Sequence, residues 1–489
     1  MSHIASLGQK NARLRLWEPC VSAIPLDQAM NSNSRSLFLK SCTWISVLSL
    51  PVIGLADKVD DYVRAEMLWQ KIPGLSIAVC KNGKVIKAQG YGYSNLETHA
   101  PAKASTPYKI GSISKQFLAA GVLVLVQKKK ISLDDSIRKH LLRAPEAWSG
   151  ITIRNLLNHT SGLVREIPGA DPSKQTPNAK IVEELYNVPL RFAPGQKWEY
   201  SNMGYFVLAE VIQKASGQPW NDFIQKEVFT PIRMSNTHEA TRKGALKQSK
   251  GYDTRNGQIQ SAEIWPALRP SGAFVSTVLD FAKWDAALNG NSLLNQASRE
   301  QMWIPAKLAS GQTKAYGFGW FLDPWNGHRR VYHSGGVPGF VAEFQRFTDE
   351  GISVIVMANI GNRDLSDIAV RVAGFYKMDL AEPTRKAIAD ANPAFTVKVR
   401  QLLLSLAKGE FDRSFFTLEA EKGVIGDIAN GFPQSLREQG NLRNIELLES
   451  KPEGNNHVYM YRAMYKHLTL YVTLAVNEES RIKRWSMAD

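Results

Sequence analysis

The chain has only three cysteines among its 489 residues, Cys20, Cys42 and Cys80. It contains neither a paired-cysteine spacing nor a His-Glu-x-x-His motif, so the sequence predicts no metal site and no other cofactor. If the N-terminal leader described next is removed, only Cys80 remains and no intrachain disulfide can form. Such a protein must be stabilised by a large core, which a chain with 44% hydrophobic residues can build.

Apart from one segment near the N-terminus, long hydrophobic runs are missing. That segment, residues 42–56, is shorter than the roughly 18 apolar residues that indicate a membrane-spanning helix. It follows Arg35 and Lys40 and ends in small residues suited to signal-peptidase cleavage. This layout predicts a secretory signal peptide over residues 30–56. We therefore expect a periplasmic or secreted protein with no stable membrane span after cleavage.

Two alternatives for this segment stay open, a signal anchor and a buried helix. A translation start at Met30 would make residues 1–29 a start-site artefact. Cys42 stands at the start of the apolar run instead of following it, so a lipoprotein anchor is not expected.

An acidic excess is also missing, because 60 Lys and Arg residues stand against 45 Asp and Glu residues, a formal net charge of +15. Such a charge favours anionic surfaces or envelope polymers. The basic residues are scattered, and the run 128–130 is more typical of a helix C-terminus than of a nucleic-acid patch. We expect a small-molecule or peptide substrate, with cell-wall material as one source, and no nucleic-acid partner. The oligomeric state stays open.

The order of expected elements indicates a sheet whose strands come from both ends of one domain. Residues 75–80 and 84–91 are strand-like, and Asn82-Gly83 between them predicts a two-residue hairpin. A largely helical block begins after Ser112. Further strands are expected at 316–322, 329–333, 341–347 and 352–358, followed by a helix at 365–376. The sequence thus predicts an α+β fold, an antiparallel sheet flanked by helices with an inserted helical subdomain, over residues 57–380.

A second, smaller α+β domain is expected at the C-terminus. Residues 381–394 lose all pattern and are interpreted as a linker. Residues 395–489 contain a helix near 395–408, an irregular middle and four strand-like segments. No catalytic set is found there, so we expect a role in packing, substrate gating or oligomer contact.

The first candidate site motif is Gly111-Ser112, which follows a strand end and opens a helix, with Lys115 one turn later on the same face. A helix N-terminus stabilises an alkoxide and an oxyanion, and a desolvated lysine can lose its proton and act as a base. The alternative is a helix-capping serine. The same Ser-x-x-Lys spacing recurs at three other places, Ser136-Lys139, Ser405-Lys408 and Ser480-Lys483.

The second motif is Tyr200-Ser201-Asn202, in a loop before a helix. Cations near Tyr200 would lower the pKa of its phenol, so that it could serve as a base and then as an acid. The Asn202 amide has donors and an acceptor, which suits a substrate amide. The alternatives are that Tyr200 fills the core and that Asn202 caps the helix.

The third motif is His333-Ser334-Gly335-Gly336, at the end of a strand. Glycines at this point allow another backbone to approach closely, and the Gly336 N–H could be an oxyanion donor opposite that of Ser112. His333 would face the cleft as a donor or a titrating charge. The alternative is a tight turn with a surface histidine.

Taken together, these motifs resemble those of the serine β-lactamase and penicillin-binding superfamily, in its class C-like branch with D-peptidases and esterases. The matching segments are residues 108–117, 156–162, 194–205 and 333–336, within a resemblance that covers roughly residues 57–380. The resemblance implies the fold predicted above. It also implies that Ser112 forms an acyl-enzyme, with Lys115 and Tyr200 as the coupled base. It further implies substrate-binding roles for Asn202, His333, Ser334 and Gly335, and an oxyanion hole formed by the backbone N–H groups of Ser112 and Gly336.

The chain departs from this resemblance at His333, because lactamases of the branch usually have a lysine followed by Thr-Gly there. A histidine is mostly neutral near pH 7 and attracts a substrate carboxylate less. We therefore expect an esterase, amidase or D-peptidase with weak or no β-lactamase activity. The alternative is a penicillin-binding sensor or cell-wall binding protein that acylates without turnover. His159, in another shared segment, is expected to shape its loop.

Overall fold

The structure is a computed structural model that describes residues 53–488, apart from 170, 172, 173, 175, 241–247, 256, 264–269, 382–384 and 430. The expected leader, residues 30–56, and the segment 1–29 therefore lie outside the described residues, except that residues 53–56 begin the first helix. None of the described helices is both long enough and apolar enough to cross a bilayer.

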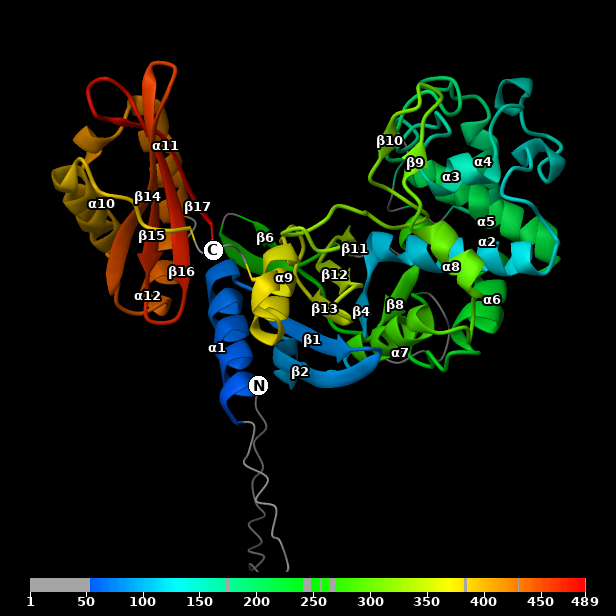
Figure 1. The fold of residues 1–489 in the computed structure, drawn as a ribbon, viewed down its shortest axis with the longest axis horizontal. Helices are drawn as coiled ribbons and strands as arrows, with labels where there is room; N and C mark the ends of the chain where they lie inside the picture. The colour runs from blue at the N-terminus through cyan, green and yellow to red at the C-terminus, as the bar shows by residue number, and fades with distance from the viewer. Residues whose placement is uncertain are drawn as a thin grey trace, which may run out of the picture. The chain divides into compact units, whose positions relative to one another are not determined.

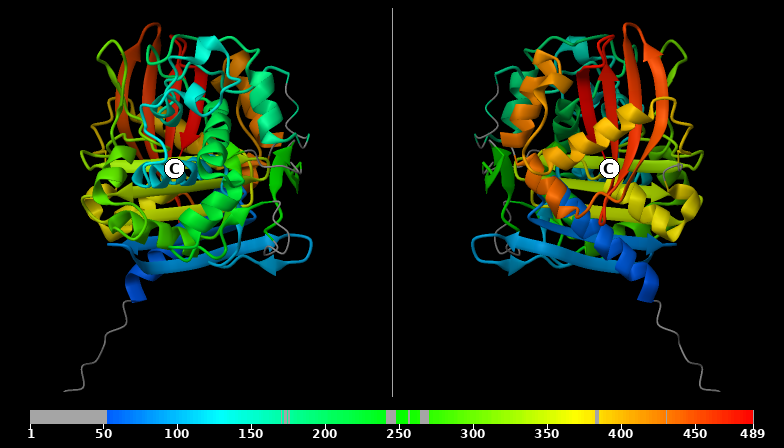
Figure 2. Two further views of the ribbon diagram at one scale, coloured as in Figure 1. Left: turned by 90° about the vertical axis from the view of Figure 1, so that its right-hand side faces the viewer. Right: turned by 90° about the vertical axis from the view of Figure 1, so that its left-hand side faces the viewer.

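A six-stranded antiparallel sheet forms the centre of the larger domain (Figures 1 and 2). Its strands, in spatial order, are β11 (Arg330–Val337), β12 (Phe340–Phe347), β13 (Ile352–Ala358), β1 (Gly74–Lys81), β2 (Lys84–Asn95) and β3 (Ala100–Pro101). Strand β1 pairs with β13, so the two ends of the domain meet in one sheet as predicted. Strand β11 lies at the edge of the described sheet, where β12 is its only strand neighbour and Tyr332 also forms an isolated bridge with Phe321.

The expected hairpin between β1 and β2 is confirmed. Lys81 pairs with Lys84, and the two residues between them, Asn82 and Gly83, have positive φ angles of 50° and 73°. Positive φ at both central positions is what a type I′ turn requires, and Asn-Gly adopts it with little strain.

Helices cover both faces of this sheet. Helices α1 (Ile53–Gln70) and α9 (Ser366–Tyr376) pack on one face, and α7 (Val278–Asn289) packs on the other. The two faces belong to separate hydrophobic clusters, because successive residues of a strand point to opposite sides.

The inserted subdomain is largely helical, as expected (Figure 1). Its helices are α2 (Ser114–Gln127), α3 (Ile153–Leu157), α4 (Asn178–Leu185), α5 (Asn202–Ser216), α6 (Trp220–Ile224) and α8 (Gln296–Met302). Three short strands, β4 (Tyr108–Lys109), β5 (His238–Glu239) and β8 (Phe274–Ser276), form a small sheet. Strands β6 (Tyr252–Arg255) and β7 (Gln258–Ser261) form a separate hairpin, and Tyr252 of β6 bridges Ile360 just after β13. Helix α2 is buried along most of its length because it is apolar on every side.

The C-terminal part is a four-stranded antiparallel sheet with three helices. Its elements are α10 (Pro393–Leu406), α11 (Leu418–Ala429), α12 (Phe432–Glu438), β14 (Asn444–Glu453), β15 (Asn456–Met464), β16 (Thr469–Val476) and β17 (Ile482–Ala488). The expected α+β character is confirmed, but the middle is not irregular, because α11 and α12 occupy it. Helix α12 packs against α1, and Gln439 Nε2 donates to the Ala65 carbonyl at 3.4 Å.

One expected strand is wrong. Residues 316–322 form only isolated bridges, of Tyr316 with Phe321 and of Phe321 with Tyr332. A β-carbon on Gly317 would lie 2.0 Å from the Met302 carbonyl oxygen, and Gly319 has a φ of 78°. The two glycines let this segment bend closely around its neighbours instead of extending.

Candidate active site

Ser112 lies in a single 3₁₀ turn, Gly111–Ile113, that leads directly into α2. The side chain is half-buried. The N-cap residues of the turn and of α2 are Ile110 and Ile113, and no side-chain hydrogen bond caps either element. Ser112 is therefore not a capping serine, and its hydroxyl is available to other partners.

Lys115 is fully buried, one turn further along α2. Its Nζ lies 3.1 Å from Ser112 Oγ, 2.7 Å from Asn202 Oδ1 and 3.1 Å from the Ser271 carbonyl oxygen. The last two oxygens can only accept hydrogen bonds. A neutral amine would thus donate its two protons to them and direct its lone pair at the Ser112 hydroxyl.

The charges around Lys115 favour that neutral amine. Burial lowers the pKa of Lys115 well below its ordinary value, Arg165 lowers this pKa further, and Glu166 partly opposes the shift. The loss of hydration penalises the ammonium form, as the sequence argument expected.

Tyr200 stands beside this pair, with its ring centre 4.8 Å from Lys115 Nζ. Burial raises the pKa of Tyr200, while hydrogen bonding with Ser112 and the charge of Arg165 offset part of the rise. The expectation of a lowered phenol pKa is therefore wrong, because desolvation outweighs the nearby cations. Tyr200 is a neutral phenol that can donate a proton.

Asn202 is the first residue of α5, and the helix is capped by its neighbour, because Ser201 Oγ accepts from Gly204 N at 3.0 Å. The Asn202 amide is free to bridge the lysine and a carboxylate, since its oxygen faces Lys115 and its Nδ2 donates to Glu166 Oε1 at 2.5 Å. Glu166 was not identified from the sequence. It lies four residues after the shared segment 156–162, a proximity that was the only available signal.

His333 is only 2% exposed, and both of its ring nitrogens have partners within the protein. Nδ1 lies 2.5 Å from the Ser334 carbonyl oxygen and Nε2 lies 3.0 Å from Tyr316 Oη. A carbonyl can only accept, so Nδ1 carries the proton and Nε2 accepts from Tyr316. Burial and the nearby Lys115 lower the pKa of His333 to about 3, so the ring is neutral. Tyr316 has no sequence signal that could have identified it.

The backbone of β11 touches the turn that carries Ser112. A β-carbon on Gly335 would lie 1.9 Å from the Ile110 carbonyl oxygen and 3.1 Å from Ser112 N, so only glycine fits. A β-carbon on Gly111 would lie 2.6 Å from Gly336 N. A β-carbon on Gly336 itself would meet nothing within 4 Å. The Ser112 and Gly336 amides thus belong to adjoining backbone segments beside open space.

Ser334 points to the opposite face of β11 from His333, because side chains alternate along a strand. It lines a cavity of about 690 Å³ that also touches Gly336 and Glu343 and extends along residues 361–365. This volume lies in the range of small-molecule sites.

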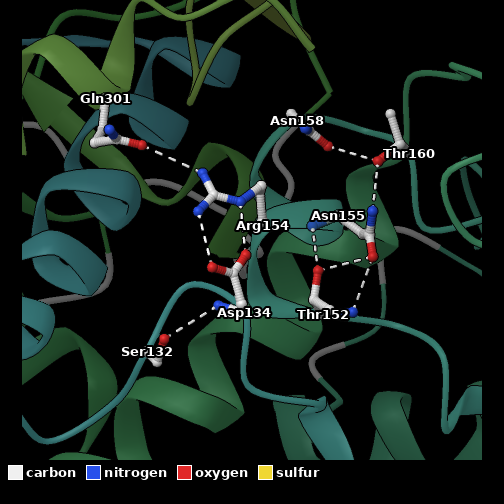
Figure 3. A network of polar contacts seen from close by, with 8 residues as sticks. All are labelled: Ser132, Asp134, Thr152, Arg154, Asn155, Asn158, Thr160 and Gln301. Atoms are coloured by element: carbon white, nitrogen blue, oxygen red, sulfur yellow. Dashed lines mark hydrogen bonds and ion pairs between the residues drawn. The ribbon is translucent and has the colours of Figure 1, made fainter. Parts of the chain in front are cut away.

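A polar network holds the loop that contains His159 (Figure 3). In the capping box of α3, Thr152 pairs with Asn155, whose Nδ2 donates to Thr160 Oγ1 at 2.9 Å. Arg154 pairs with Asp134 in the same network. Asn158 and Thr160 of this network flank His159 in the sequence. His159 adopts a φ of 62°, and its ring centre lies 4.3 Å from that of Tyr200. His159 therefore packs under the phenol, in agreement with a loop-shaping role.

Burial lowers the pKa of His159 well below its ordinary value, so it adds no charge beneath the site. Within the described ranges, no cluster of His, Cys, Asp or Glu side chains could hold a metal ion.

Comparisons with known proteins agree with this fold. Penicillin-binding protein 4* of Bacillus subtilis is 31% identical over 307 residues, which are 58% of this chain and 67% of that protein. The octameric penicillin-binding protein homologue from Pyrococcus abyssi superposes with a TM-score of 0.62 at 22% identity, covering 88% of this chain and 95% of that one. The D-amino acid amidase from Ochrobactrum anthropi SV3 superposes with a TM-score of 0.55 at 25% identity, covering 67% of this chain and 99% of that one.

A protein-family model described as beta-lactamase matches residues 59–374, which contain all of the candidate site residues. The chain therefore belongs to the beta-lactamase family, within the superfamily of serine hydrolases that includes the penicillin-binding proteins.

Proposed function

We propose that this protein is an exported serine hydrolase that cleaves ester or amide bonds, including D-peptide bonds, through an acyl-enzyme on Ser112. The observation that carries this proposal is the contact set of Lys115, whose two obligate acceptors leave its lone pair for the Ser112 hydroxyl. Export rests on the signal-peptide layout of residues 30–56.

In this mechanism Lys115 takes the Ser112 proton as Oγ attacks the substrate carbonyl carbon. The carbonyl π bond becomes an oxyanion, held by the backbone N–H groups of Ser112 and Gly336. Tyr200 then donates its proton to the leaving nitrogen or oxygen, and Lys115 returns a proton to the phenol. Water repeats the sequence on the acyl-enzyme and releases the acid, restoring the Ser112 hydroxyl.

In this proposal the substrate is positioned by Asn202 and by the backbone of Ser334 and Gly335. The His333 ring was expected to face the cleft, but it is 2% exposed and both of its nitrogens have partners within the protein, so it does not contact the substrate directly. A neutral His333 supports weak or absent β-lactamase activity, because β11 then lacks a fixed cation for the lactam carboxylate at that position. The likeness to a D-amino acid amidase supports an amide of a D-amino acid as one substrate type. The cavity beside Ser334 is lined by none of Ser112, Lys115, Tyr200 and Asn202, so it is not assigned to the substrate in this proposal.

The test is intact-mass spectrometry of the protein after brief exposure to an activated aryl ester and, separately, to a penicillin. We expect one adduct on the parent that decays with turnover of the ester, and none on Ser112→Ala. The matched control is Ser136→Ala, which removes the serine of another Ser-x-x-Lys sequence and should label like the parent. Labelling of Ser112→Ala at the parent level would exclude Ser112 as the nucleophile.

The second candidate function is a penicillin-binding sensor or cell-wall binding protein, favoured by the likeness to penicillin-binding proteins. It would show a burst of adduct with no steady rate, whereas an enzyme shows both.

A further inference from the structure

The turn that joins β11 to β12 is held by contacts with residues outside the sheet, a set of contacts that we call the clamp. The turn consists of Pro338 and Gly339, and Val337 alone separates it from Gly336, whose N–H is the candidate oxyanion donor. Within the turn, a β-carbon on Gly339 would lie 2.6 Å from Ala262 Cβ and 2.7 Å from Gly251 Cα. Gly339 has a φ of 77° and is therefore required here both by conformation and by space.

Asp253, on β6, provides the polar contact of this clamp. Its Oδ1 accepts a hydrogen bond from Gly339 N at 3.2 Å. A β-carbon on Gly361 would lie 2.1 Å from the same oxygen. The carboxylate thus fits between the turn and the loop 361–365, and a glycine is needed at position 361 to admit it.

Arg363 fixes that loop to the rest of the domain. Its Nε donates to the Gln70 carbonyl at the end of α1 at 2.6 Å, and its Nη2 donates to Thr254 Oγ1 on β6 at 2.7 Å. The charge of Asp253 acts on this guanidinium and opposes the fall in the Arg363 pKa that burial causes. Since α1 packs against α12 of the C-terminal part, the loop is tied to the helix on which that part rests.

We propose that Asp253 is a positioning residue that keeps the Gly336 N–H beside the Ser112 N–H, with Arg363 holding the loop against which Asp253 packs. This inference rests on the proposed function, in which Gly336 is an oxyanion donor. Strand β11 has β12 as its only strand neighbour in the described sheet, and the bridge of Tyr332 with Phe321 supports only its beginning, so its end needs a restraint from elsewhere. A donor that moves out of place loses much of its effect on the transition state.

The test compares Asp253→Ala, Asp253→Asn and Glu263→Ala. Asparagine keeps an oxygen that can accept from Gly339 N, so it should restore what alanine loses. Glu263 is an exposed carboxylate that lines, together with Asp253, the cavity beside Ser334, and it serves as the matched control. All variants are first shown to be folded by their melting temperatures.

Two readouts are taken, the acylation rate constant with an activated ester and amide hydrogen exchange of Gly336, Val337 and Gly339. Removing a whole oxyanion donor costs about 10²–10³ in rate, so a displaced donor should cost about tenfold in Asp253→Ala, with KM nearly unchanged. Exchange of these amides should become faster in the same variant. Asp253→Asn and Glu263→Ala should stay within about twofold of the parent on both readouts.

Parent-like acylation and exchange in a folded Asp253→Ala would overturn the inference. An Asp253→Asn variant as slow as Asp253→Ala would also overturn it, because charge and not the Gly339 bond would then matter. Failure of the parent itself to acylate would instead remove the proposed function. The exchange readout would still test the clamp, since it requires no reaction.

Discussion

The side-chain amide of Asn202 joins a buried lysine to an exposed carboxylate. Its oxygen lies 2.7 Å from Lys115 Nζ, and its nitrogen lies 2.5 Å from Glu166 Oε1. The bond to Glu166 fixes which end of the amide faces the lysine. Glu166 and the adjacent Arg165 also act on the Lys115 pKa in opposite directions, because the carboxylate raises it and the guanidinium lowers it.

Removing the charge of Glu166 or of Arg165 should shift the pH dependence of the acylation rate in opposite directions. In Glu166→Gln the carboxylate no longer raises the Lys115 pKa, while an oxygen remains to accept from Asn202. The acid limb, which is the fall in acylation rate at low pH as Lys115 becomes protonated, should then shift to lower pH. The amine stays neutral over a wider pH range. In Arg165→Gln the limb should shift to higher pH. Stopped-flow acylation with an uncharged activated ester, over a range of pH, measures both shifts.

Glu199→Gln is the matched control, because Glu199 is a half-buried carboxylate paired with Arg191. It should leave the limb where it is in the parent. Shifts of the same sign in Glu166→Gln and Arg165→Gln would show that the limb does not report Lys115.

The local part of the site could be predicted from sequence because local geometry determines it. Ser112 and Lys115 are three residues apart at the start of a helix, a spacing that brings two side chains onto one face. The Asn82-Gly83 hairpin was predictable for the same kind of reason, since two residues with positive φ define its turn.

What the sequence could not supply depends on contacts between distant segments. Tyr316 meets His333 only because its segment bends closely around its neighbours, and the same bend removes the strand expected at 316–322. The pKa of Tyr200 was predicted with the wrong sign, because neighbouring cations can be guessed from sequence but the degree of burial cannot.

The neutral, buried His333 should make the fold sensitive to acid. Its pKa is about 3 in the folded state, against an ordinary 6.5, so below pH 6.5 the unfolded chain takes up a proton that the folded chain refuses. The free energy of unfolding should fall as pH drops from about 6.5 towards 3, by at most about 1.4 kcal/mol per pH unit from this group. In His333→Gln the slope of unfolding free energy against pH should be flatter over that window.

Urea unfolding at several pH values measures this slope, which is independent of any constant loss from the broken Tyr316 bond. His467→Gln, at an exposed histidine, should keep the parent slope. An unchanged slope in His333→Gln would mean that the ring titrates equally in both states.

Glu343 should produce the opposite dependence on pH. It is 1% exposed, lies directly opposite Ser334 across the β11–β12 ladder, and accepts from Gln345 Nε2 at 3.1 Å. Burial raises its pKa to about 8 from an ordinary 4.5, so the folded chain keeps a proton that the unfolded chain releases. The free energy of unfolding should therefore fall as pH rises from about 4.5 to 8.

Glu343→Gln should remove this loss, because the amide oxygen can still accept from Gln345 and no charge can appear beside Ser334. The measurement is the difference in unfolding free energy between pH 5 and pH 8, with Glu184→Gln at an exposed position as the control. The Glu343→Gln variant should lose less stability than the parent over this interval, and the control should lose as much. An equal loss in all three proteins would mean that Glu343 is ionised in the folded state. A carboxylate charge would then already stand beside Ser334 at neutral pH, and substrates with a carboxylate near that residue would be repelled.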